Sequence, residues 1–285
     1  MNLQKLRATV LITAQKLAEE ITTEPTPVLL DVRWALPPAG TTYDGLSKYQ
    51  AGHLPGAVFV NLETELSAPP TAAEGRHPLP ELDAFTAAVR SWGVNTNSRV
   101  VVYDANNGIS AARAWWLLRY FGVHNIRLLD GGLAAWQRIG LPIETGDRKN
   151  APGDVTLTSG HLKTIDADEA AALATSTHGV LLDARAPERY RGEIEPIDPQ
   201  AGHIPGAINA PTSINLTPDG AFAQPADLQQ VYACCEMQTV GVYCGSGVTA
   251  AHNVLALASI GVEAALYPGS WSQWSNDSAR PVATD

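Results

Sequence analysis

Short apolar runs alternate with longer helix-like segments along the first half of the chain. The β-prone runs cover residues 28–31, 58–61, 100–103 and 126–129. The segments 80–92 and 110–121 are helix-like instead. Because runs of about four apolar residues bounded by turns are typical of buried strands, the alternation predicts an α/β fold. We expect a mainly parallel sheet with helices on both of its faces.

The same sequence blocks occur twice, in the same order. Val-Leu-Leu-Asp-Val-Arg at residues 28–33 returns at 180–185 with one change, and Ala-Gly-His-Leu-Pro-Gly-Ala at 51–57 returns at 201–207 with Ile for Leu. Residues 131–136 likewise match 269–274. Such ordered self-similarity indicates a duplicated domain. The stretch 143–165 has turn-forming residues without a sustained period. The predicted boundaries are therefore 1–145 for the first domain, 146–164 for the linker and 165–285 for the second domain.

The second copy contains a cysteine at a predicted strand-to-helix turn. The β-prone run 239–243 precedes Cys-Gly-Ser-Gly-Val-Thr at residues 244–249, and an Ala/Leu-rich segment follows. The carboxyl ends of parallel strands are where such sheets bind ligands. The glycines allow successive N–H groups to point inward, and the helix start adds unpaired N–H groups and a positive dipole end. These groups favour a thiolate, so Cys244 is the candidate nucleophile.

Two other interpretations of Cys244 are less consistent with this loop. A free cysteine is often a small buried hydrophobe, but the Gly-X-Gly pattern favours a reactive site. A cysteine phosphatase would need an arginine six residues after the cysteine, and that position is Ala250. A phosphoester dianion would then lack its bidentate partner, which excludes a phosphatase.

Composition narrows the class of function. The 285 residues, 45% apolar and 17% charged, suffice for two cores. A formal net charge of −10 and the lack of a basic run exclude nucleic acid and anionic membrane as partners, so arginines must gather locally to bind an anionic substrate. Three cysteines, two of them adjacent, form no disulfide framework and fit a reducing cytoplasm. No apolar run reaches the ~20 residues of a membrane helix, and the amino-terminal one is too short for a signal peptide.

The Cys-Gly-Ser-Gly-Val-Thr loop and the duplicated Gly-His-(Leu/Ile)-Pro-Gly-Ala block resemble the rhodanese family of sulfurtransferases, in particular its 3-mercaptopyruvate type. The resemblance covers nearly the whole chain and implies a tandem pair of rhodanese-like domains. It also implies a ping-pong reaction in which Cys244 carries a persulfide, with no metal and no organic cofactor. Thiosulfate-preferring members usually have basic residues after the cysteine, where this chain has Gly245 and Ser246.

The first copy differs at the position of the cysteine. Val-Val-Tyr-Asp at 101–104 matches Gly-Val-Tyr-Cys at 241–244, and the turn after Asp104 is one residue longer. Since aspartate cannot carry a sulfur atom, the first domain is predicted to be catalytically silent and to shape the site. His53 and His203 occur in both copies, so each is predicted to hydrogen-bond nearby backbone rather than to act in catalysis.

The resemblance also implies roles for side chains outside the loop. Arg189 matches the family arginine that binds the donor's carboxylate or sulfonate, and Arg191 is a further candidate because neither has a twin in the first copy. Arg185 is a weaker candidate, since its twin Arg33 points to a role in the fold. The family's second arginine would lie in the stretch 193–200, which has none.

The loop itself and the first domain supply the remaining candidates. Ser246 is expected to work with a histidine and an acidic residue of the first domain, which by position are His77 and Glu63. Thr249 is predicted to cap the helix through its hydroxyl. The outer sulfur would accept hydrogen bonds from the backbone N–H groups of Gly245, Ser246, Gly247, Val248 and Thr249.

The implied partners are a small anionic donor and a thiophilic acceptor. The donor is 3-mercaptopyruvate, which the loop favours, or thiosulfate; the acceptor is cyanide, a small thiol or a reduced thioredoxin-like protein. A redox or arsenate-type cysteine enzyme remains an alternative that needs a resolving cysteine, although Cys234 and Cys235 lie at the far end of the strand leading to Cys244. A non-catalytic sulfur-carrier or interaction module is the other alternative.

Overall fold

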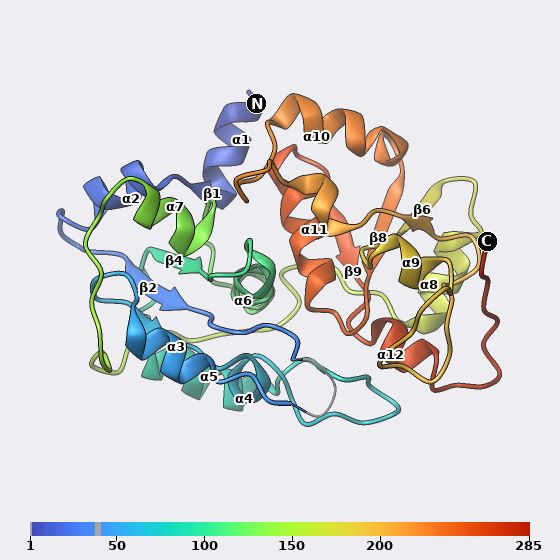
Figure 1. Cartoon of the computed structure of the whole chain (residues 1–285), viewed down its shortest axis with the longest axis horizontal. Helices are drawn as coiled ribbons and strands as arrows, with labels where there is room; N and C mark the ends of the chain where they lie inside the picture. Colours follow the sequence, from blue (N-terminus) through green and yellow to red (C-terminus); the bar gives the residue numbers. More distant parts are fainter. Residues whose placement is uncertain (1, 38–40) are drawn as a thin grey trace.

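Each half of the chain forms its own parallel sheet in the computed structural model, which describes residues 2–37 and 41–285 (Figure 1). The first sheet has the order β1-β5-β4-β2-β3, and the second has the order β7-β6-β8-β9. Every pair of neighbouring strands is parallel. The predicted α/β fold with two similar domains is therefore confirmed.

The strands of the first domain are β1 (Leu11–Ile12), β2 (Val28–Asp31), β3 (Val58–Phe59), β4 (Val100–Tyr103) and β5 (Ile126–Leu129). Those of the second are β6 (Gly179–Asp183), β7 (Ile208–Asn209), β8 (Thr239–Tyr243) and β9 (Ala264–Leu266). The strand expected at 58–61 ends two residues early. Its last residue, Asn61, instead caps the next helix, because its side chain accepts a hydrogen bond from the N–H of Glu63 at 3.0 Å.

Helices cover the sheets. The first domain has α1 (Leu3–Val10), α2 (Ala14–Glu20), α3 (Gly45–Ala51), α4 (Leu62–Glu65), α5 (Leu82–Ser91), α6 (Ile109–Tyr120) and α7 (Gly132–Arg138). The second has α8 (Ala167–Ala174), α9 (Pro187–Tyr190), α10 (Pro225–Val231), α11 (Thr249–Ser259) and α12 (Ser270–Trp274), with short 3₁₀ turns η1 (Thr212–Asn215) and η2 (Ala233–Cys235).

One hydrophobic cluster spans both domains, and each domain has a second cluster of its own. Helices α6 and α11 are apolar on nearly all sides and pack against each other where the domains meet (Figure 1). Such helices are stable only when other elements surround them. One hydrophobic cluster accordingly includes Val102 and Trp116 of the first domain together with Val242 and Leu255 of the second. This shared packing fixes the loops that precede α6 and α11 against each other.

The segment between the domains is held along both of them. Its N–H groups at Gly153 and His161 donate to the carbonyl oxygens of Arg90 and Tyr120, at 2.8 and 3.0 Å, in the first domain. Thr164 then forms a parallel bridge with Leu266 of the second sheet. The segment after α7 therefore runs over the first domain before it joins the second.

The duplicated histidines bond to backbone, as predicted. Nδ1 of His53 lies 3.0 Å from the carbonyl oxygen of Tyr49, and Nδ1 of His203 lies 2.8 Å from that of Tyr190. The His53 ring also stacks on the ring of Tyr49, and the His203 ring stacks on that of Tyr190. These contacts fix the turn before β3 in the first domain and the turn before β7 in the second.

Candidate active site

Cys244 lies between β8 and α11, where the two domains meet. The residue is 1% exposed, and its N–H donates to Oγ of Ser270 at 3.2 Å. Gly247, three residues on, has a φ of +75°, and a Cβ atom there would come within 2.7 Å of the carbonyl oxygen of Pro268. The loop therefore needs glycine at this position to pass so close to the strand-to-helix connection after β9.

The prediction that Thr249 caps α11 is wrong. Thr249 is the first residue of the helix, the N-cap is Val248, and no side chain caps the helix. The physical reason is the tight turn at Gly247, which starts the helix one residue earlier than the capping pattern requires. The N–H groups at the helix start consequently have no side-chain acceptor.

The first domain shows what the equivalent turn binds. The Asp104 carboxylate accepts four backbone hydrogen bonds, two on each oxygen, at 2.8 to 2.9 Å. The donors, which we call the Asp104 cradle, are the N–H groups of Asn106, Gly108, Ser110 and Ala111. Its left-handed glycine comes four residues after Asp104, against three after Cys244, so this turn is indeed one residue longer. Burial raises the pKa of Asp104, and these four hydrogen bonds oppose that effect by favouring its charged form.

Ser246, His77 and Glu63 lie in one row. Nδ1 of His77 is 2.7 Å from Oγ of Ser246, and its Nε2 is 3.3 Å from the Glu63 carboxylate. The hydrogen bond from His77 holds the pKa of Glu63 below its usual range, against the opposing effect of its partial burial. Trp34 fixes Glu63 by donating from Nε1 at 2.7 Å. The structure thus brings together the three residues that sequence reasoning grouped, with two of them from the first domain.

The three candidate arginines occupy different environments. Arg189 lies beside the loop, with Nη1 at 3.5 Å from the position that a Cβ atom of Gly245 would take. Arg185 is buried and paired with Asp183 at 2.6 Å, and it also donates to the carbonyl oxygen of Gly202. Arg191 is 46% exposed and paired with Glu193 at 2.7 Å. Arg189 is thus the one of the three that the structure places against Gly245.

Arg185 repeats the bonding of its twin. Arg33 pairs with Asp31 at 2.6 Å and donates to the carbonyl oxygen of Gly52 at 3.0 Å. Arg33 therefore ties β2 to the turn before β3, and Arg185 ties β6 to the turn before β7. This agreement supports a role for Arg185 in the fold.

Sequence reasoning missed Arg113, a buried cation on α6. Its side chain is fully buried, and Nη1 donates to the carbonyl oxygen of Gly247 across the domain boundary at 3.3 Å. The other acceptors are the carbonyl oxygens of Leu66, His77 and Pro78. Burial lowers the pKa of Arg113 to about 10, and the negative charge of a Cys244 thiolate raises it. In the described part of the chain no carboxylate pairs with Arg113. The available signal was an arginine inside the otherwise apolar run 111–118 of α6.

A second missed residue is Arg76, next to His77 in the chain. Its guanidinium is paired with Asp198 of the second domain, and Nη2 lies 3.1 Å from the position of a Gly245 Cβ atom. The contact between Arg76 and Gly245 depends on how the domains pack, and no sequence pattern predicted it.

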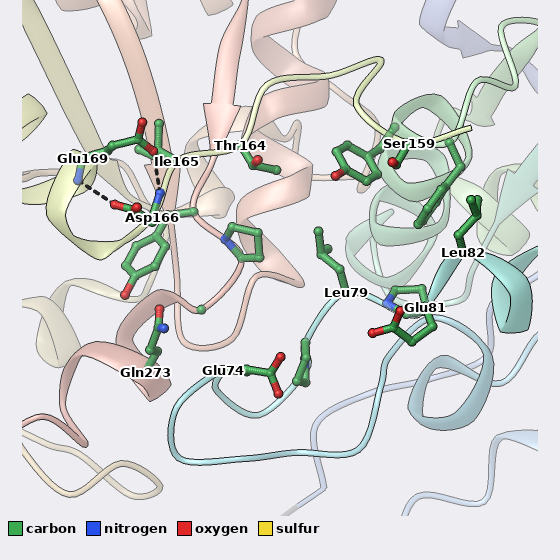
Figure 2. Close-up of a pocket in the computed structure, with 17 residues that line it drawn as sticks. Glu74, Leu79, Glu81, Leu82, Ser159, Thr164, Ile165, Asp166, Glu169 and Gln273 are labelled. Atoms are coloured by element: carbon green, nitrogen blue, oxygen red, sulfur yellow. Dashed lines mark hydrogen bonds between the residues drawn. The ribbon is translucent and has the colours of Figure 1, made fainter. Parts of the chain in front are cut away.

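Cys244 lines none of the five described cavities. One of about 640 Å³ is lined from both domains and the linker, as Figure 2 shows. Its acidic side chains are Glu74, Glu81, Asp166 and Glu169, and Cys244 is not among the described residues that line it. Such a lining does not suit an anionic donor, so the site is defined by the converging loops instead.

The other two cysteines are poor resolving thiols. Cys234 and Cys235 are free, their sulfurs are 3.9 Å apart, and they belong to η2, before the start of β8, whereas Cys244 follows its end. Burial raises the pKa of the Cys235 thiol to about 12. This placement argues against redox chemistry with Cys244.

Neither a metal-binding cluster nor a membrane-spanning helix occurs among the described residues. No group of three or more His, Cys, Asp or Glu side chains in this part of the chain is placed to hold a metal ion. Among the same residues, no helix has the length and apolar character needed to cross a membrane.

Known proteins resemble this chain over almost its full length. The family model described as the rhodanese-like domain matches twice, over residues 13–139 and 166–277. The chain is 48% identical to a putative thiosulfate sulfurtransferase, SseB, of Mycobacterium tuberculosis, over 97% of each protein. It is 45% identical to a probable 3-mercaptopyruvate sulfurtransferase of Pseudomonas aeruginosa, over 96% of this chain and 98% of that protein.

A solved structure agrees with these sequence matches. The crystal structure of SseA from Escherichia coli, a 3-mercaptopyruvate sulfurtransferase, superposes with a TM-score of 0.80 at 34% identity. The match covers 92% of this chain and 99% of that one. Both domains therefore have counterparts of the same arrangement.

Proposed function

We propose, from the premise that this chain belongs to the rhodanese family and is a sulfurtransferase, that it moves a sulfane sulfur through a persulfide on Cys244. The donor is a small anion, 3-mercaptopyruvate in preference to thiosulfate. The acceptor is cyanide, a small thiol or a reduced thioredoxin-like protein. The observation that carries the proposal is the 2.7 Å contact between His77 and Ser246, which assembles a polar row from both domains beside Cys244.

In the first half-reaction the Cys244 thiolate attacks the donor sulfur. A new S–S bond forms while the C–S bond of 3-mercaptopyruvate breaks, and the electron pair leaves with carbon as the enolate of pyruvate. With thiosulfate the S–S bond of the donor breaks instead, and the pair leaves with sulfite. The enolate must take up a proton to become pyruvate, whereas sulfite can leave as an anion.

Ser246, His77 and Glu63 are suited to that proton transfer. Ser246 comes two positions after Cys244 in the chain, and Nδ1 of His77 can pass a proton to the Ser246 hydroxyl. Glu63 orients the imidazole from the other side. This arrangement favours 3-mercaptopyruvate, because thiosulfate makes no use of it.

The persulfide is held by the backbone of residues 245–249. The Asp104 cradle supports this role, since the same kind of turn there binds two carboxylate oxygens through four N–H groups. Preorganised N–H groups stabilise negative charge without rearrangement. In the second half-reaction the acceptor attacks the outer sulfur, and the S–S bond breaks to return the Cys244 thiolate.

The alternative donor is thiosulfate, and similarity to a putative thiosulfate sulfurtransferase favours it. Either reaction belongs in the reducing cytoplasm, which would keep the three free cysteines as thiols. The first domain takes no covalent part in it, because Asp104 stands where the nucleophile would be.

The decisive experiment compares wild type and Cys244→Ser with both donors. We expect wild type to gain one sulfur atom on Cys244, seen by mass spectrometry, and the variant to gain none and to lose turnover. Circular dichroism should show the same fold for both proteins. A Cys244→Ser protein with full activity would contradict the proposal.

A second variant separates the two donors. His77→Gln should lower kcat with 3-mercaptopyruvate about 100-fold, the usual contribution of general acid catalysis, and change kcat with thiosulfate much less. Equal losses with both donors would show that His77 does not act on the leaving group.

A further inference from the structure

A second cavity between the domains, of about 580 Å³, takes no part in the proposed function. It is lined from α1, α6, α11, β9 and the linker, and by no described residue of the loop 244–249. Helix α11 packs against both α6 and α1 where the domains meet (Figure 1). A cavity of this volume lies within the ~300–1,000 Å³ typical of small-molecule sites, which often occur at domain interfaces.

The walls of this cavity are largely apolar. Val10 of α1, Leu162 of the linker, Val254 of α11 and Val262, just before β9, contribute alkyl side chains. Val10 and Val254 are 5% and 4% exposed, and Leu162 and Val262 pack against the same hydrophobic cluster. An apolar group bound here would therefore leave water for contact with alkyl groups.

One basic side chain at the cavity has no carboxylate partner. Arg119 lies in the last turn of α6, is partly buried, and donates from Nη1 to the carbonyl oxygen of His124 at 3.2 Å. Among the described residues no carboxylate offsets the burial of its charge, and this burial lowers its pKa. Because a guanidinium can donate to both oxygens of a carboxylate, Arg119 is suited to bind one from a ligand.

The other charged groups leave the lining net positive. Lys163 lines the cavity from the linker, and its ammonium is 3.3 Å from Glu263, the one carboxylate among the described lining residues. These two side chains are 77% and 87% exposed, so their pairing is weak. His161 also lines the cavity, with Nε2 at 2.8 Å from Oγ1 of Thr158. Two permanent cations against one carboxylate, in a chain of net charge −10, favour an anionic ligand.

A buried donor at the cavity lacks an acceptor. Trp115 of α6 is 2% exposed and lines the cavity, and its Nε1 has no hydrogen-bond partner among the described residues. Buried indole N–H groups usually have one. A ligand oxygen in the cavity could supply this acceptor.

We propose that this cavity binds a small amphipathic carboxylate, with its apolar chain against α1 and α11 and its carboxylate at Arg119. The inference goes beyond the proposed function and does not depend on sulfur transfer at Cys244. Because the ligand would contact both domains and the linker, its binding would stabilise their packing.

Isothermal titration calorimetry at pH 7 tests the site with octanoate, and with octylammonium as a probe of equal chain length and opposite charge. Wild type should bind one octanoate per chain, and octylammonium about tenfold more weakly because the lining is net positive. Protein alkylated at Cys244 with iodoacetamide should bind octanoate with an unchanged Kd. Absence of saturable octanoate binding, equal binding of octylammonium, or loss of octanoate binding after alkylation would overturn the inference.

Variants of two arginines locate the carboxylate. Arg119→Ala should raise the octanoate Kd about tenfold, because one charge-assisted contact is lost, and Arg119→Lys should recover part of the affinity. Arg138→Ala removes the last-turn arginine of another helix, α7, which does not line the cavity, and should leave the Kd as in wild type. Equal Kd values for Arg119→Ala and wild type, or an equal rise in Arg138→Ala, would exclude the site.

A larger side chain on α11 locates the apolar chain of the ligand. Ala258 lines the cavity and is partly buried, so Ala258→Phe should fill it and abolish octanoate binding. Circular dichroism checks that this variant folds, and octanoate binding at the wild-type Kd by the folded variant would contradict the proposal. If Ala258→Phe does not fold, the comparison of Arg119→Ala with Arg138→Ala decides.

Discussion

The turn after β4 and the turn after β8 are built alike and filled differently. In the first, the chain's own Asp104 carboxylate occupies four backbone N–H groups. In the second, Cys244 stands at that position and the helix start has no side-chain cap. The comparison indicates that the first copy of the turn is closed by one of the chain's own side chains. In the second copy, the proposed function places the transferred sulfur at this position.

The side chain that reaches each turn from the other domain also differs between the two turns. Arg113 on α6 donates to the carbonyl oxygen of Gly247 at 3.3 Å, and His252 on α11 lies with Nε2 at 3.2 Å from that of Asn107. Each therefore contacts the turn of the other domain. Burial lowers the pKa of His252 to about 4, so the group facing the aspartate turn is neutral at pH 7. The cation faces the turn whose negative charge must be stabilised.

The strongest test of this comparison places aspartate, the residue at position 104, in the turn after β8. Cys244→Asp should abolish sulfur transfer, a loss of at least ~10⁴-fold. Its free energy of unfolding, measured in urea, should nonetheless be about 2 kcal/mol higher than that of Cys244→Ser, because the carboxylate accepts hydrogen bonds from the backbone N–H groups. If Cys244→Asp is the less stable of the two, the turns are not equivalent.

The converse change empties the Asp104 cradle. Asp104→Ala leaves four buried N–H groups without their acceptor, and we expect a loss of about 4 kcal/mol in the free energy of unfolding. Asp104→Asn keeps one acceptor oxygen and should lose less. Urea titration measures both variants. A loss below about 1 kcal/mol in Asp104→Ala would mean that these hydrogen bonds do not hold the turn.

Removing the buried cation should affect the working turn. Arg113→Met should slow the reaction of Cys244 with iodoacetamide at pH 7 about 100-fold, since a nearby buried positive charge stabilises the thiolate. Arg113→Lys retains the charge and should recover most of the rate. Alkylation at Cys244 is measured by peptide mass spectrometry between pH 6 and 9. Equal rates for the two variants would assign Arg113 a purely structural role.

The smallest expected effect concerns His252 and pH. Its folded-state pKa of about 4 lies below the ~6.5 of the unfolded chain, so folding favours the neutral form. The stability that results is fully present above pH ~6.5 and is lost as pH falls towards 4. Between pH 7 and 5, wild type should lose about 2 kcal/mol more than His252→Gln, as measured by urea unfolding. Parallel losses would contradict a buried neutral imidazole.

The architecture could be predicted from the sequence because strands are indicated by short local runs and the two domains by repeated blocks. Residues 100–103 and 239–243 are apolar and β-prone, and both form the predicted strands. The duplicated blocks identified two domains, and the exchange of cysteine for Asp104 distinguished them. Ser246, His77 and Glu63 were grouped through family resemblance, and the fold does bring them together.

The missed features depend on how the domains pack. Arg76 reaches Gly245 because the two domains meet there. Arg113 is one of two arginines in α6, and no sequence pattern places it beside the Gly247 carbonyl. The capping error at Thr249 arose because a left-handed glycine two residues earlier moved the helix start. Each case involves a contact between segments far apart in sequence, or a backbone conformation that composition does not reveal.

The reach of first-domain side chains into the Cys244 loop has an evolutionary consequence. After duplication, a copy without its nucleophile would ordinarily be free to decay. Here Arg76, His77 and Arg113 of that copy each contact the loop or a residue beside it. Deletion of the first domain would remove all three contacts, so we expect selection to retain this copy although it lacks a nucleophile.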